Sequence, residues 1–68
     1  MPRVRPADMD DVEAFVYFEH LEADPVEVRL AVEAGASLDV EETLANDEGA
    51  DYSKLMLDGK QIGFWPGY

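Results

Sequence analysis

The sequence predicts a single small α+β domain over residues 1–68, with two or three short N-terminal helices packed on a C-terminal antiparallel β-hairpin. Acidic residues stand at spacings typical of helix starts in the first two thirds of the chain. In the last third, an Asp-Gly pair separates two apolar runs, which is the strongest short-range sign of a hairpin. A short third strand at the N-terminus, around Val4, would extend the sheet.

The first helix is expected over residues 8–21. Asp8 is a typical N-cap residue, and Asp10 and Asp11 follow in the first turn, where negative charge interacts favourably with the helix dipole. The apolar run 14–18 would also suit a strand. The N-cap and the acids on either side of the run favour a helix.

The second helix is expected over residues 25–34. Asp24 can cap it, Pro25 suits the first helical position, and Glu27 can complete a capping box. Gly35 supplies the left-handed residue that ends many helices. The inward face is expected to be broad and to consist of Val26, Leu30 and Ala34, with Val28, Ala31 and Val32 beside them.

A third, shorter helix is expected to begin at Asp39, because Glu42 follows at the spacing of a capping box. Val40 and Leu44 would face inward, and the helix would end within residues 46–49. It would depend on packing, since isolated helices shorter than about 12 residues are marginal in water.

The hairpin joins residues 52–57 to residues 60–65 through Asp58 and Gly59, which can both adopt the positive φ that a tight turn requires. On one face the turn would pair Leu57 with Lys60, Leu55 with Ile62, and Ser53 with Phe64. On the other face it would pair Met56 with Gln61, Lys54 with Gly63, and Tyr52 with Trp65. The first face is more apolar, which predicts a core made of Phe15, Phe18, Leu30, Leu44, Leu55, Leu57, Ile62 and Phe64.

Net charge is the strongest functional indication. Sixteen Asp and Glu residues outweigh five Lys and Arg residues, which gives a net charge of −11, and Arg29 is the only basic residue between Asp8 and Asp51. Such a field repels nucleic acids and anionic membranes and favours partner proteins with basic surfaces. The alternative is a merely solvated acidic surface, which would be ordinary in a saline cytoplasm.

Several function classes are excluded by what the sequence lacks. It has no cysteine, so thiolate metal sites and disulfides are excluded, and no apolar run long enough for a signal peptide or a membrane span. His20 is the single histidine and is expected to be solvated or to cap a helix. The paired carboxylates match no calcium-loop spacing. We therefore expect a cytoplasmic, non-enzymatic protein with no metal and no cofactor.

Two sets of residues are candidates for binding a partner. Carboxylates on ordered elements can imitate DNA phosphates, and this first set contains Asp10, Asp11, Glu13, Glu41, Glu42, Asp47 and Glu48. The second set contains Tyr52, Trp65 and Tyr68, because Trp and Tyr dominate binding hot spots. The alternative for the single Trp is that it closes the core of a small domain.

Residues 3–8, followed by Asp10-Asp11-Val12, resemble the start of GNAT-superfamily acetyltransferases, where a strand and an Arg-Pro-Ala-type segment lead into a capped helix. Residues 55–64, ending in Ile-Gly-Phe, resemble their later hairpin. The chain ends before the Gly-rich acetyl-CoA loop of that family, so the resemblance implies a truncated, non-catalytic protein. Residues 27–36 are similar to one helix of an ankyrin repeat, but a solenoid needs about three repeats.

The leading hypothesis is a non-enzymatic factor that binds a basic, nucleic-acid-binding surface of a partner protein and so inhibits or regulates it. Small phage-encoded DNA mimics have this size and charge. Such a factor would bind neither nucleic acid nor membranes itself. The alternatives are a structural or adaptor subunit anchored through the C-terminal aromatic residues, and a truncated GNAT-like protein without activity.

Overall fold

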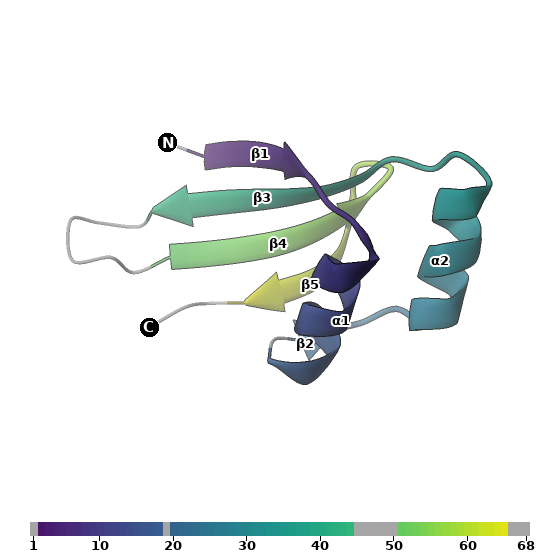
Figure 1. Cartoon of the computed structure of the whole chain (residues 1–68). Coiled ribbons are helices and arrows are strands. Elements are labelled where there is room, and N and C mark those ends of the chain that lie inside the picture. Colours follow the sequence, from purple (N-terminus) through teal and green to yellow (C-terminus); the bar gives the residue numbers. More distant parts are fainter. Residues whose placement is uncertain (1, 19, 45–50, 66–68) are drawn as a thin grey trace.

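The computed structural model describes residues 2–18, 20–44 and 51–65. In chain order its elements are β1 (Pro2–Pro6), α1 (Met9–Tyr17), β2 (His20–Leu21), α2 (Pro25–Glu33), β3 (Leu38–Leu44), β4 (Asp51–Leu57) and β5 (Lys60–Trp65). The strands form one antiparallel sheet in the order β1-β3-β4-β5-β2 (Figure 1). The helices therefore lie in the middle of the sequence, between strands that become neighbours in the sheet.

The α+β class is confirmed, but the predicted arrangement of helices on a C-terminal hairpin is wrong. A five-stranded sheet dominates the structure, and the hairpin of β4 and β5 is only part of it. The predicted N-terminal strand is present as β1, yet it pairs with β3 and not with the hairpin. This error follows largely from one element, because a third helix was expected where the structure has strand β3, which lies between β1 and β4.

The first helix is confirmed at its start. The Asp8 carboxylate accepts hydrogen bonds from the backbone N–H groups of Asp10 and Asp11 at 3.0 and 3.2 Å, and the Asp11 carboxylate accepts one from the N–H of Asp8 at 3.0 Å. This reciprocal pair is a capping box. The helix ends at Tyr17, four residues earlier than predicted, because the chain then turns into β2 at His20.

The second helix is also confirmed, with Asp24 accepting a hydrogen bond from the N–H of Val26 at 2.9 Å and Gly35 at a φ of +103° just past its end. Its predicted inward face is confirmed for Val28 and Val32 but wrong for Val26 and Leu30. Val28 is buried, whereas Val26 and Leu30 are 63% and 60% exposed. The helix carries apolar residues around most of its circumference, so its sequence did not determine which side meets the core.

The predicted third helix is wrong, because residues 38–44 form strand β3. In β3, Val40 is buried and lies between Arg5 of β1 and Leu55 of β4. Glu41 lies opposite Lys54, and Glu42 lies opposite Arg3. Pairing with two distant strands therefore decides the conformation here and overrides the local capping-box spacing.

The turn of the hairpin is confirmed. Asp58 and Gly59 have φ values of +49° and +82°, as a two-residue turn requires. The turn is tied to the segment before β3, because the N–H of Ser37 donates to Asp58 Oδ1 at 2.9 Å and the N–H of Asp58 donates to the carbonyl oxygen of Ser37 at 2.8 Å. The pairs next to the turn, Leu57 with Lys60 and Met56 with Gln61, are those predicted.

Beyond these two pairs the predicted register is wrong by one residue. Leu55 pairs with Gly63, which leaves Ile62 as the extra residue of a β-bulge on β5. Both Ile62 and Gly63 are buried on the helix side. The side chains that follow are exchanged between the faces, so Phe64 lies on the face away from the helices and Trp65 lies on the helix side.

Gly63 is the point of closest approach between the sheet and α1. A Cβ atom at this position would lie 2.9 Å from Cδ1 of Phe15, 3.1 Å from the carbonyl oxygen of His20 and 3.3 Å from Cβ of Leu55. These distances are shorter than ordinary van der Waals contacts, and one of them is to backbone. The missing side chain therefore lets the Phe15 ring pack directly on β5.

The core lies between the helices and the sheet and consists of Val12, Phe15, Val28, Leu38, Val40, Leu55 and Ile62. The predicted core residues confirmed in it are Phe15, Leu55 and Ile62, and Leu57 packs against it half-buried. Phe18 is 82% exposed and lies outside the core, because α1 has ended before it. Leu30 and Phe64 were also predicted wrongly, for the reasons given above, and Leu44 belongs to β3.

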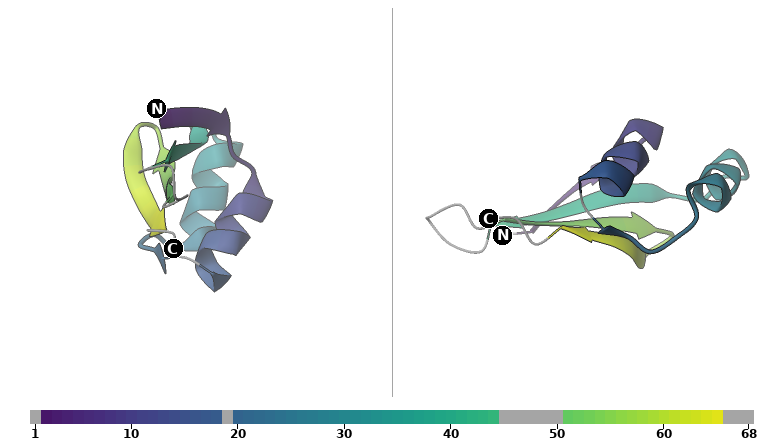
Figure 2. Two further views of the ribbon diagram at one scale, coloured as in Figure 1. Left: turned by 90° about the vertical axis from the view of Figure 1, so that its left-hand side faces the viewer. Right: turned by 90° about the horizontal axis from the view of Figure 1, so that it is seen from below.

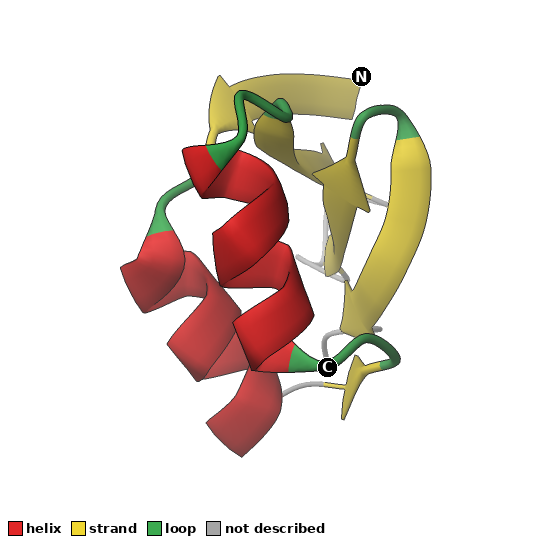
Figure 3. Cartoon of the chain, turned by 90° about the vertical axis from the view of Figure 1, so that its right-hand side faces the viewer, coloured by secondary structure: helices red, strands yellow, loops and turns green. Residues whose placement is uncertain are grey.

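Helix α1 lies over one side of the sheet, and α2 lies next to α1, beyond the ends of the strands (Figure 2). Seen from the end of the molecule at which α2 lies, the two helices run next to each other, with the strands beside and behind them (Figure 3). No helix of the described residues covers the side of the sheet opposite α1, which we call the open face. Across the sheet it carries Val4, Asp39, Glu41, Thr43, Tyr52, Lys54, Met56, Gln61 and Phe64, as the register of the paired strands requires.

Strand β1 forms one edge of the sheet and has a proline at each end, Pro2 and Pro6. The N–H of Ala7 donates to the carbonyl oxygen of Leu38 at 2.9 Å, so odd-numbered residues of this segment point their N–H groups toward β3. Even-numbered residues point outward. Of these, only Val4 has an N–H group to offer at the outer edge, because proline has none.

Candidate binding surfaces

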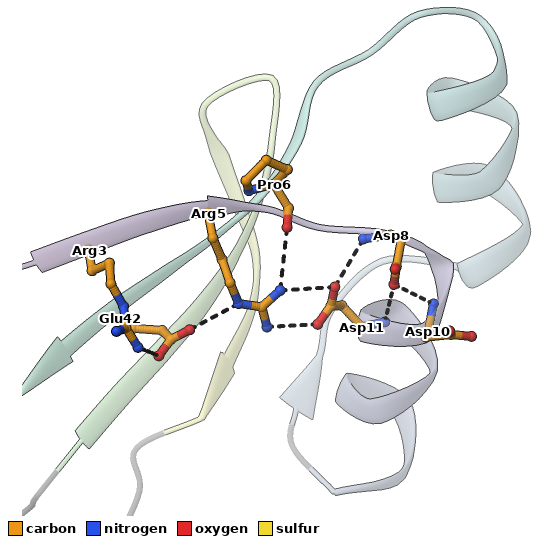
Figure 4. Close-up of polar contacts among 7 residues, drawn as sticks. All are labelled: Arg3, Arg5, Pro6, Asp8, Asp10, Asp11 and Glu42. Atoms are coloured by element: carbon orange, nitrogen blue, oxygen red, sulfur yellow. Dashed lines mark hydrogen bonds and ion pairs between the residues drawn. The ribbon is translucent and has the colours of Figure 1, made fainter.

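A network of charged side chains joins β1, β3 and α1 (Figure 4). The Arg5 guanidinium binds the Asp11 carboxylate through two hydrogen bonds, Nη2 to Oδ1 at 2.8 Å and Nη1 to Oδ2 at 3.2 Å. Its Nε atom donates to Glu42 Oε1 at 3.0 Å, and Arg3 Nη2 donates to Glu42 Oε2 at 2.8 Å. Each carboxylate thus meets a positive charge that comes from a different element of the fold.

The network shifts the pKa of its members in the directions that pairing requires. The hydrogen bond from Arg5 lowers the pKa of Asp11 below its usual value. The hydrogen bond from Arg3, followed by that from Arg5, lowers the pKa of Glu42. Hydrogen bonds to Asp11 and then Glu42 raise the pKa of Arg5 above its already high usual value. All three groups therefore remain charged near neutral pH.

This pairing changes the role of two predicted binding residues. Asp11 and Glu42 are both neutralised locally by arginines, and Asp11 also closes the capping box of α1. A partner that used these carboxylates would have to compete with Arg3 and Arg5. Local sequence patterns do not reveal this pairing, because the paired residues are 6 to 39 positions apart.

The exposed acids that remain on α1, α2 and their N-caps form what we call the acidic helical layer. Its members are Asp8, Asp10, Glu13, Asp24, Glu27 and Glu33. Six negative charges against Arg29 give this layer a net charge of −5. In the described part of the chain, none of the six forms an ion pair with Lys or Arg, since the ion pairs lie elsewhere. Of these six, Asp10 and Glu13 belong to the acidic set named above from the sequence.

The other predicted acids are not brought together with them. Glu41 lies on the open face, opposite Lys54 on β4. Asp47 and Glu48 lie outside the described residues. The predicted acidic set is therefore divided between the two sides of the molecule and the charged network.

The predicted aromatic anchor is divided as well. Because of the bulge, Tyr52 faces Phe64 on the open face, with ring centroids 5.8 Å apart, while Trp65 lies opposite Ser53 on the helix side. The predicted pair of Tyr52 and Trp65 is therefore wrong. Tyr68 lies outside the described residues. The predicted register placed Phe64 on the wrong face of the sheet, although an isolated glycine in a strand, here Gly63, is a recognised sign of a bulge.

The described residues contain no group of three His, Asp or Glu side chains able to hold a metal ion. His20 lies at the sheet edge, exposed, with Nε2 3.8 Å from Glu22 Oε1. It borders a shallow depression with Val16, Leu21, Ala23 and Pro25. Neither described helix is long and apolar enough to cross a membrane.

No family model matches the chain, and neither the curated proteins nor the solved structures that we compared with it gave a match. The resemblance to GNAT-superfamily acetyltransferases accordingly stays a prediction. The fold and its two contrasting surfaces define a small two-layer α+β protein with an acidic helical side and a nearly neutral sheet side.

Proposed function

We propose that the protein is a non-enzymatic binding factor that engages a basic surface of a partner protein through the acidic helical layer. The observation that supports this proposal is the separation of charge in the fold. Arg3 and Arg5 are both bound to carboxylates of the network at β1, whereas the acids on the outside of α1 and α2 have only Arg29 among them. Among the described residues, the unpaired negative charge is therefore greater on the helical layer than on the open face.

The class of partner follows from the sign and density of this charge. Proteins that bind nucleic acids present basic surfaces that attract phosphate groups through Lys and Arg. A rigid acidic surface is attracted to the same sites and speeds association by electrostatic steering. Occupying such a site would exclude the nucleic acid, so the proposed effect on the partner is inhibition or regulation.

The experiment is a capture assay with the immobilised protein and cell lysate, followed by competition with DNA on each purified captured protein. We expect nucleic-acid-binding proteins that DNA displaces. We also expect capture to fail at about 0.5 M salt, where the Debye length is roughly 4 Å. Reversing two charges of the layer, in the double variant Glu13→Lys and Glu27→Lys, should abolish capture because it changes the layer by four charges.

The matched control is the double variant Asp39→Lys and Glu41→Lys, which makes the same change in net charge on the open face. It should retain capture, provided that circular dichroism shows both variants to be folded. Capture that survives 0.5 M salt and the helical reversals would contradict the proposal. Equal loss in both variants would reduce the effect to net charge alone and would also contradict it.

A further inference from the structure

The open face carries apolar residues although no helix of the described residues covers it. Its apolar members are Val4, Tyr52, Met56 and Phe64. Val4 is 62% exposed and Tyr52 is 39% exposed, while Phe64 and Met56 are half-buried by their neighbours in the sheet. When one side of a sheet faces only water, the residues on that side are normally polar. Here four apolar side chains come from three different strands, which is typical of a contact surface.

The charges on the open face are few and nearly balanced. Asp39 and Glu41 stand against Lys54, which gives a net charge of −1, compared with −5 for the acidic helical layer. In a chain with a net charge of −11, this is the described side on which another molecule of the same charge meets least repulsion. A second copy of this chain is therefore an acceptable partner here and an unfavourable one on the helical side.

The positions of Glu41 and Lys54 also suit a symmetric contact. They lie opposite each other on β3 and β4, the two middle strands of the four that carry the open face. In a two-fold symmetric interface every contact occurs twice. If residue i of the first copy contacts residue j of the second, then residue j of the first copy contacts residue i of the second. An axis that passes between β3 and β4 would place Glu41 of each copy over Lys54 of the other.

We propose that two copies of this chain pack through their open faces, sheet on sheet. The apolar residues Val4, Tyr52, Met56 and Phe64 are removed from water, and Glu41 pairs with Lys54 across the two-fold axis. The sheet then becomes buried on both sides, as in β-sandwiches, whose sheets lie about 10 Å apart. The acidic helical layers point outward in opposite directions. This pairing is independent of the function proposed above, because it uses the other side of the molecule.

The first test compares the wild type with two variants, one at an exposed valine and one at an exposed leucine. The method is sedimentation equilibrium over a range of protein concentrations. Val4→Glu adds a negative charge to the open face, and Leu30→Glu adds the same charge at a site of similar exposure, 60%, on the outside of α2. We expect the wild type to dimerise, Val4→Glu to weaken the dimer by at least about tenfold, and Leu30→Glu to leave it unchanged. A wild type that stays monomeric up to about 1 mM (a Kd of 1 mM corresponds to weak association) overturns the proposal, as does equal weakening by both variants.

The second test exchanges charges between the copies. In E41K each copy presents two lysines to the other, and in K54E each presents two glutamates, so each variant alone should be monomeric. An equimolar mixture of the two restores both Glu–Lys contacts, and we expect a mixed dimer. A mixture that stays monomeric while the wild type dimerises overturns the proposed geometry. Retained capture of basic partners by these monomeric variants would show that the function proposed above does not depend on pairing.

Discussion

Neighbouring residues of β4 lie in opposite environments on the two faces of the sheet. Leu55 is completely buried under α1, whereas the next residue, Met56, lies on the open face. On the helix side, Leu55 and the other core residues fill the space between the sheet and the helices. On the open face, Met56 and Phe64 are covered only in part, by neighbours in the sheet such as Tyr52, and no helix of the described residues packs on them. Apolar residues that the fold itself does not bury indicate a binding surface.

The largest expected effect tests this contrast directly. Leu55→Ala should lower the free energy of unfolding by about 2–5 kcal/mol, because it leaves a cavity at the centre of a small core. Met56→Ala should cost less than about 1.5 kcal/mol in the monomer, since its side chain is only half-buried. Urea unfolding followed by circular dichroism at low protein concentration measures both. Similar losses for the two variants would remove the distinction between the faces.

The second prediction concerns the closest contact on the helix side. Gly63→Ala should destabilise the protein by about 1–3 kcal/mol, because the new methyl group would overlap with Phe15 and with the backbone at His20. Replacing Phe15 with Leu in the same chain should recover part of this loss, as the ring atom at 2.9 Å is removed. The measurement is a double-mutant cycle of unfolding free energies. Strict additivity of the two substitutions would show that this contact does not limit residue 63.

The smallest expected effect lies where the helix side becomes polar. Asp11 and Glu42 have a lowered pKa in the folded protein, so their pairing stabilises the fold above their unfolded pKa values, 3.8 and 4.5. This contribution is lost as the pH falls through their folded values. Arg5→Gln should therefore cost about 0.5–1 kcal/mol at pH 7, limited by solvent because the Arg5 side chain is 45% exposed.

The difference between wild type and Arg5→Gln should disappear as the pH is lowered below the folded pKa values of the two carboxyl groups. Thermal unfolding between pH 2 and pH 7 measures it, with Lys60→Gln as a control that removes an exposed cation at the hairpin turn. A constant difference across this range would mean that packing of the Arg5 side chain, and not its charge, stabilises the junction of β1, β3 and α1.

What could be predicted from the sequence was local. Asp8 and Asp24 cap their helices, and Asp58-Gly59 forms its turn, because each of these depends on residues within a few positions. Strand β3 could not be found in the same way. Its spacing of Asp39 and Glu42 imitates a helix start, and its conformation is decided by pairing with β1, about 37 residues earlier, and with β4.

The candidate surfaces were predicted less well for a related reason. A single extra residue in β5 exchanges Phe64 and Trp65 between the two faces of the sheet. No local rule states to which face the side chains beyond a bulge point. Similarly, the acids of α1 could be counted from the sequence, but not which of them Arg5 would bind. The acidity of the protein was evident, whereas its concentration on the helical layer required the fold.

The outer edge of β1 has a consequence for how copies of this protein can join. Sheets of separate molecules fuse into fibrils when an edge strand offers a row of unpaired backbone donors and acceptors. With Pro2 and Pro6 on either side of Val4, that edge offers a single amide donor, so a foreign strand finds no ladder to complete. Edge fusion has no natural limit, whereas contact between two faces ends at a pair. At this edge, the prolines therefore disfavour the open-ended addition of strands.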